Sequence, residues 1–302
     1  MKRKDFWITL CLVNLCIVAL FGMTLRTKFL FPVQFIDYKN FLSAHSHFAF
    51  GGWITLALMI LYIDNLLTPD QKQNKVYQWI LWGVEITSVG MLITFPFQGY
   101  ALFSIIFSTA FIFFTYGFSW VFIRDLRRAK KDRSITLLSS SALLSLVISS
   151  VGPFTLAYIM ITKTGNAFLY RDAIYTYLHF QYNGFFTLSV FALFFNRLLA
   201  IMTNDIRKRI WYFALFLCLS VVPALFLSLL WHGYNIYVRT LALTGCALII
   251  TSLLFFSRII LNRKIYARYT SPLARTLLIL SMISFTIKFL KPGQDYQCCI
   301  IK

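Results

Sequence analysis

Nine apolar stretches, each long enough to cross a lipid bilayer, dominate this sequence of 302 residues. A bilayer with a hydrocarbon core of about 30 Å requires roughly 20 apolar residues per helix. The stretches are continuously apolar, whereas a membrane β-barrel strand would alternate, so we predict α-helices. They cover residues 7–25, 44–66, 77–97, 100–123, 135–162, 173–196, 210–231, 235–257 and 272–290. The sequence therefore predicts an all-α polytopic membrane protein, a bundle of about nine transmembrane helices forming a single integral membrane domain over residues 1–302.

Composition supports a membrane protein and excludes two other classes. Charged residues make up 13% of the chain, hydrophobic residues 59%, and the mean hydropathy is +0.72. Soluble domains carry about 25% charged residues, so an ordinary soluble enzyme is excluded. Disorder is excluded as well, because disordered chains combine low hydrophobicity with high charge. The cysteines form no secreted disulfide framework, since four of them lie inside apolar stretches: Cys11, Cys16, Cys218 and Cys246.

The distribution of Lys and Arg predicts how the chain is threaded. With a cytoplasmic N-terminus, the inner segments carry 20 of these residues and the outer loops carry 6. This asymmetry follows the positive-inside rule and predicts a multi-pass protein of the inner (cytoplasmic) membrane. The net charge of +19 is then a consequence of topology and of contact with the lipid bilayer. We therefore expect no nucleic-acid partner.

Few polar groups lie inside the apolar stretches, and they are the candidates for function because such groups are costly in a membrane. They include all four histidines of the chain, His45, His47, His179 and His232, which the predicted topology places near the outer face. Glu85 lies in the middle of the third stretch. It is either a proton relay or a protonated residue with a structural hydrogen bond.

The two histidines of the second stretch, His45 and His47, lie two residues apart within Ser43–Trp53. Residues with this spacing point about 200° apart on a helix, so the pair cannot readily chelate one small ion. Each could ligate a different group on its own flank. Gly51 and Gly52 would allow close approach of a helix or a flat macrocycle. Alternatively, the histidines form interfacial hydrogen bonds and the glycines only pack helices.

The sixth stretch carries a second polar face. Tyr175, His179, Tyr182 and Asn183 share one side of the helix by their spacing. Asn183 or Tyr182 could orient a ligand histidine, since ligating imidazoles commonly donate their second N–H to another group. A simple polar contact between helices is the alternative.

The run Ala44–Gly51 resembles an element of subunit I of haem-copper oxidases and nitric oxide reductases, in which His-x-His reaches two haems on opposite flanks of one helix. Leu178-His179-Phe180 adds a weaker similarity. The resemblance implies a b-type haem held by His179 and either His45 or His47. It also implies electron transfer or the handling of oxygen or nitric oxide, with other respiratory subunits or a cytochrome as partners. If the chain is an enzyme, the resemblance implies an oxidoreductase.

The family uses twelve helices and six ligand histidines, whereas this chain offers nine stretches and four histidines. No cluster of three further histidines is left, so we expect neither copper nor non-haem iron in this chain alone. Residues 291–302 form an atypical tail, of the kind expected in a truncated or frame-shifted chain.

The alternative function is a metal-ion or small-solute transporter, or an accessory membrane protein, with no redox centre. The four histidines would then line an outer entry site for a transition metal, and Glu85 would lie deeper in the path. Transporters commonly contain repeated helices, and the sequence shows no convincing internal repeat.

Overall fold

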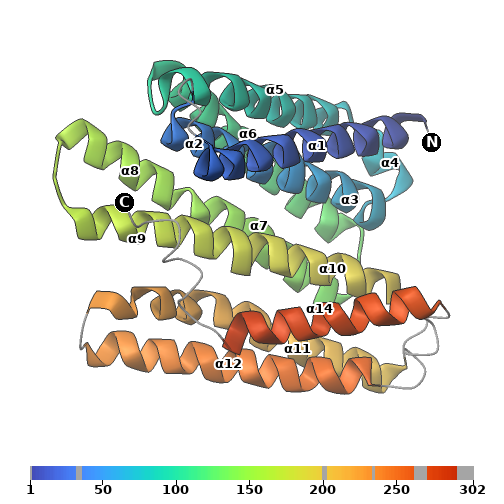
Figure 1. Cartoon of the computed structure of the whole chain (residues 1–302). Helices are drawn as coiled ribbons and strands as arrows, with labels where there is room; N and C mark the ends of the chain where they lie inside the picture. Colours follow the sequence, from blue (N-terminus) through green and yellow to red (C-terminus); the bar gives the residue numbers. More distant parts are fainter. Residues whose placement is uncertain (1, 32–35, 199–202, 233–234, 262–270, 291–302) are drawn as a thin grey trace. The chain divides into compact units, whose positions relative to one another are not determined.

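The computed structural model describes residues 2–31, 36–198, 203–232, 235–261 and 271–290, and among them every regular element is helical (Figure 1). All nine predicted stretches are helical, which confirms the all-α fold class. Of the helical runs in the described residues, seven are long and apolar enough to cross a membrane, so the chain is a multi-pass membrane protein. The number of nine transmembrane helices stays a prediction. The side on which the N-terminus lies stays a prediction, and the tail 291–302 lies outside the described residues.

Packing divides the chain into two compact units, Met1–Lys131 and Asp132–Lys302, within what the sequence indicated as a single domain. We call them the amino-terminal and carboxyl-terminal units. The amino-terminal unit contains α1 (Lys2–Leu30), α2 (Tyr38–Phe48), η1 (Ala49–Thr55), α3 (Leu56–Leu66), α4 (Pro69–Lys72), α5 (Lys75–Gln98) and α6 (Leu102–Arg128). The carboxyl-terminal unit contains α7 (Arg133–Ser149), α8 (Val151–Thr162), α9 (Ala167–His179), η2 (Phe180–Phe186), α10 (Thr187–Leu198), α11 (Asn204–Leu225), η4 (Phe226–His232), α12 (Ile236–Ile260) and α14 (Pro272–Leu290).

A π-helix interrupts one long helix in each unit. In the amino-terminal unit, α2, η1 and α3 run on as one helix, and the Leu56 N–H donates to the carbonyls of Gly51 and Trp53. In the carboxyl-terminal unit, α9, η2 and α10 do the same, and the Thr187 N–H donates to the carbonyls of Tyr182 and Gly184. A π-turn of this kind leaves a carbonyl without its usual partner four residues on, and such turns are frequent at functional sites.

Charged contacts bring the basic segments of the amino-terminal unit to one end of it. Lys4 of the N-terminal segment and Lys72 both contact the Asp64 carboxylate at the end of α3. Lys131, which follows α6, donates to the Asn65 carbonyl at 3.3 Å. Burial and, less strongly, the charge of Lys72 lower the pKa of Lys131. The three basic segments therefore lie together, as the alternating topology of this unit requires.

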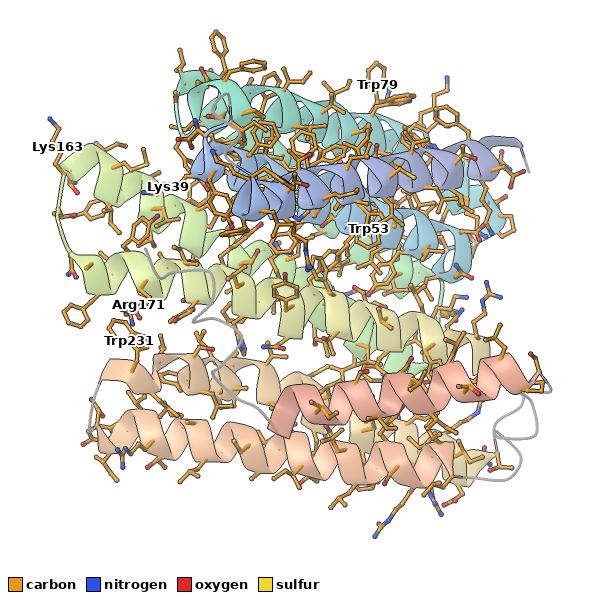
Figure 2. The ribbon with its side chains drawn as sticks, viewed as in Figure 1. Lys39, Trp53, Trp79, Lys163, Arg171 and Trp231 are labelled. Carbon is orange, nitrogen blue, oxygen red and sulfur yellow. The ribbon has the colours of Figure 1, made fainter. Side chains whose placement is uncertain are left out.

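Most faces of these helices are apolar and several remain exposed, as expected for helices surrounded by lipid. Trp79 on α5 projects away from its unit and is exposed (Figure 2). The buried side of α1 carries a regular stripe of Trp7, Cys11, Asn14, Val18 and Leu25. This spacing of three and four residues is that of one helix face. Asn14 is the polar member of that buried stripe.

Glycines allow close helix packing at defined positions, and one pair provides a test. A Cβ at Gly152 in α8 would lie 2.5 Å from the backbone carbonyl oxygen of Ala173 in α9, whereas a Cβ at Gly117 in α6 would first meet Ile80 at 3.9 Å. Both substitutions raise helix propensity by about 1 kcal/mol. We expect Gly152→Ala to destabilise the protein by about 1–3 kcal/mol and Gly117→Ala to be neutral or stabilising, measured by unfolding in detergent micelles. Equal effects would contradict the close contact of α8 and α9.

Candidate functional site

His45 and His47 leave α2 on opposite flanks, as their spacing requires. The His45 ring lies against α1 in a slot opposite Gly22, where an added Cβ would come within 3.1 Å of Cε1. The His47 ring lies against α5, stacked on Phe95 with ring centroids 4.6 Å apart and an interplanar angle of 7°. The amino-terminal unit therefore presents one imidazole to each neighbouring helix.

The two ring nitrogens of His45 differ in their surroundings. The ring makes a hydrogen bond with the backbone of Val18 on α1, while Nδ1 is buried and has no hydrogen-bond partner. Buried polar atoms without partners are rare, and each one calls for an explanation. A histidine held by a backbone carbonyl at one nitrogen, with the other nitrogen open, has the arrangement usual for metal-ligating imidazoles.

His47 has a more complete set of contacts. Its Nε2 lies 3.0 Å from the Tyr100 hydroxyl, and the Tyr100 ring packs against Phe95 with centroids 4.9 Å apart. His47, Phe95 and Tyr100 form an aromatic group. It connects the end of α2 with α5 and with the loop between α5 and α6. The hydroxyl gives His47 an orienting partner that the sequence analysis did not identify.

A polar network lies deeper in the amino-terminal unit. The Asn14 amide on α1 donates one hydrogen bond to the Gly52 carbonyl at 2.7 Å and a second to Glu85 Oε2 at 2.9 Å. Asn14 and Glu85 are both buried. The Gly52 carbonyl belongs to η1, in which the Leu56 N–H donates to Gly51 and Trp53. Asn14 therefore supplies a donor to η1 and links that segment to Glu85.

His179 in the carboxyl-terminal unit is buried, with both ring nitrogens in hydrogen bonds. Nε2 lies 2.7 Å from the Val221 carbonyl and Nδ1 lies 3.0 Å from Asn183 Nδ2. The carbonyl can only accept, so Nε2 carries the proton and Nδ1 accepts from Asn183. Asn183 thus orients His179, which was one of the options that the spacing suggested. To bind iron, Nδ1 would have to exchange this hydrogen bond for the metal.

The predicted site residues fall into separate units. His45, His47 and Glu85 belong to the amino-terminal unit, whereas His179 and His232 belong to the carboxyl-terminal unit, where His232 ends η4. In the described part of the chain, no group of three or more His, Cys, Asp or Glu side chains is placed to hold a metal ion.

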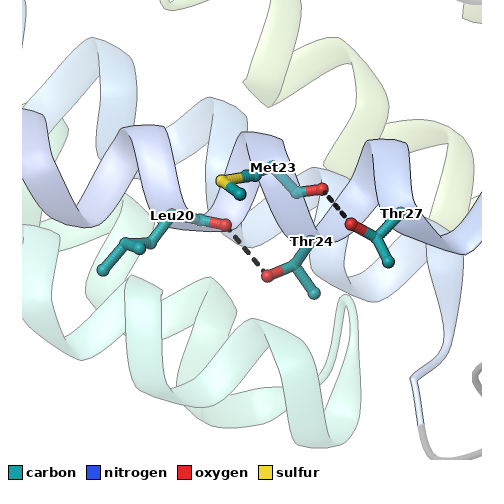
Figure 3. Close-up of a pocket in the computed structure, with 4 residues that line it drawn as sticks. All are labelled: Leu20, Met23, Thr24 and Thr27. Atoms are coloured by element: carbon teal, nitrogen blue, oxygen red, sulfur yellow. Dashed lines mark hydrogen bonds between the residues drawn. The ribbon is translucent and has the colours of Figure 1, made fainter.

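A shallow pocket on the exposed face of α1 is a poor candidate for a site. It is lined by Leu20, Met23, Thr24 and Thr27 (Figure 3). The Thr24 hydroxyl donates to the Leu20 carbonyl at 2.9 Å, and the Thr27 hydroxyl donates to the Met23 carbonyl at 3.0 Å. Both hydroxyl protons are thus directed to their own helix, and the pocket offers a mainly apolar surface suited to lipid.

Comparison with known proteins yields no relative: no protein family, no curated protein and no solved structure matches this chain.

The different surroundings of the histidines predict different costs of removing them. His179→Ala would remove the hydrogen bonds to the Val221 carbonyl and to Asn183 and would open a cavity, so we expect a loss of about 2–4 kcal/mol in the free energy of unfolding. His45→Ala should cost less, because the His45 side chain is half-buried and has one hydrogen bond to lose instead of two. Unfolding of the two variants in the same detergent measures the difference. A greater loss of stability for His45→Ala would contradict this description.

Proposed function

We propose that this chain is a haem-binding protein of the cytoplasmic membrane, with its N-terminus in the cytoplasm and its ligand histidines toward the outer face. Its role is electron transfer or the handling of oxygen or nitric oxide, and its partners are other respiratory subunits or a cytochrome. The observation that carries this proposal is His45, whose Nδ1 is buried without a partner while the ring is bonded to the Val18 backbone. Resemblance to oxidase subunit I supports it through the Ala44–Gly51 run.

The residues present fit a haem in part. His45 offers an open nitrogen, and His47, on the other flank of α2, offers a second imidazole already oriented by Tyr100. When bound, haem would supply one-electron chemistry at its iron. The chain's own contribution is to hold neutral imidazoles in apolar surroundings. His179 stays a predicted ligand, at the cost of its bond with Asn183.

A second candidate function is a cation transporter, and one observation favours it. Val18, bonded to His45, and Asn14, bonded to Glu85, lie one turn apart on the buried face of α1. Polar groups thus continue from His45 toward Glu85 in the middle of α5. An outer histidine with a deeper carboxyl is the arrangement expected for an ion path.

Visible spectroscopy of the purified protein tests the haem proposal. We expect a reduced-minus-oxidised spectrum with a b-type α band at about one haem per chain, checked by pyridine haemochrome and metal analysis. His45→Ala should remove most of the haem, because it removes the open ligand atom.

Tyr100→Phe serves as the matched control, since it keeps His47 and removes only its hydrogen bond, and it should retain the haem. A colourless wild-type protein would overturn the proposal, and zinc or copper in place of iron would favour the transporter. Full haem retention in His45→Ala would exclude His45 as a ligand.

A further inference from the structure

The two units share one order of elements, related by a shift of 132 residues, the separation of His47 and His179. With this shift, the range of α1 falls on α7 and α8, and α3 and α10 end at corresponding residues, Leu66 and Leu198. The ranges of α5 and α6 fall on α11 with η4 and on α12. The π-helix begins just after the corresponding histidine in both units: η1 begins two residues after His47, and η2 begins one residue after His179. The sequence alone gave no convincing repeat, and the register of the helices reveals one.

Residue identities support this register in the long helix of each unit that contains the π-helix, namely α2–η1–α3 and α9–η2–α10. Between 38–66 and 170–198, eight of the 29 positions are identical. They are Tyr38/Tyr170, His47/His179, Phe48/Phe180, Gly52/Gly184, Thr55/Thr187, Leu56/Leu188, Leu61/Leu193 and Leu66/Leu198. Lys39 corresponds to Arg171, so the charge at the start of this helix is also kept (Figure 2). Between α5 and α11, the identical pairs are Trp79/Trp211, Ser88/Ser220 and Val89/Val221.

Packing within each unit follows the same scheme. The π-helix η1 packs against α1 and α5, and η2 packs against α7 and α11, which are the corresponding first and third helices. The third helix packs against the fourth in both cases, α5 on α6 and α11 on α12. The carboxyl-terminal unit therefore acts as an internal comparison, showing which residues this fold requires.

Glu85 is not among the residues that the fold requires. Its counterpart in the carboxyl-terminal unit is Leu217, and the counterpart of His45 is Tyr177. The first helix of that unit places Ser145, rather than an asparagine, against the glycine of the π-helix, Gly184. The same helix arrangement thus forms without the carboxyl. A structural hydrogen bond for packing does not account for Glu85, since leucine serves in the equivalent place.

We propose that Glu85 and Asn14 form a proton-binding site in the membrane, specific to the amino-terminal unit. Both contacts of Asn14 come from Nδ2, one to the Gly52 carbonyl and one to Glu85 Oε2, so Oε2 accepts a hydrogen bond. The remaining oxygen, Oε1, takes up one proton from a hydronium ion, which leaves water and converts the carboxylate to the neutral acid. In the reverse step the acid returns the proton to water as hydronium. Asn14 holds the carboxyl in place in both states.

The next question is which polar or charged groups face the Glu85 carboxyl. Asn14 and the Cys11 thiol face it, both from α1. Of the described residues on α2, η1, α3 and α6, which also surround α5, no charged side chain acts on it. The proposal does not depend on haem, because the site involves neither His45 nor His47.

Glu85 is the only glutamate in the chain, which makes a single-site measurement possible. The full-length protein would be made by cell-free synthesis with glutamate labelled with ¹³C at the carboxyl carbon, and placed in lipid nanodiscs. We expect one carboxyl resonance that moves between its charged and neutral positions across the range of pH in which the protein stays folded. A resonance fixed at either position over this range would overturn the proposal.

Two variants complete the experiment. Asn14→Leu removes the donor to Oε2 and should displace the Glu85 resonance at every pH. Ser145→Ala, which alters the side chain that faces Gly184 in the other unit, should leave the whole titration unchanged. An unaltered resonance in Asn14→Leu would overturn the role of Asn14. The wild-type titration decides the main claim even if Asn14→Leu fails to fold.

Discussion

A membrane offers no water to unpaired backbone groups, and this constraint governs the amino-terminal unit. The η1 segment directs the Leu56 N–H to Gly51 and Trp53, and the Gly52 carbonyl receives its hydrogen bond from the Asn14 side chain. Such a departure from α-helical bonding is tolerated in a membrane when a neighbouring helix provides a partner. The same side chain binds Glu85, so the repair of the backbone also fixes the position of the carboxyl.

The repeated π-helix places two equivalent histidines in different surroundings. His179 has both nitrogens bonded within its unit, while His47 stacks on Phe95 and contacts Tyr100. His45 has no histidine counterpart, and its Nδ1 is buried without a hydrogen-bond partner. At the corresponding positions the amino-terminal unit has His45 and Glu85, where the carboxyl-terminal unit has Tyr177 and Leu217. The repeat also strengthens the transporter alternative, because transporters are commonly built from such halves.

The sequence predicted the helices well, because a long apolar stretch leaves a membrane segment little choice of structure. It also predicted that His45 and His47 face opposite sides, since this follows from helical geometry alone. It did not predict the π-helices, whose hydrogen bonds shift without a distinctive composition at Ala49–Thr55. The partner of Glu85 was missed because Asn14 lies 71 residues away in the chain. The repeat was missed because its first and fourth helices have diverged, and only the second and third keep recognisable residues.

The haem proposal depends on Nδ1 of His45 acting as a ligand atom. The most direct measurement is ¹⁵N NMR of the histidine rings in the full-length protein as purified from membranes, assigned with single histidine variants. We expect bound iron to displace or broaden the His45 Nδ1 signal. An ordinary neutral imidazole at His45, with an unperturbed Nδ1 signal, would contradict it.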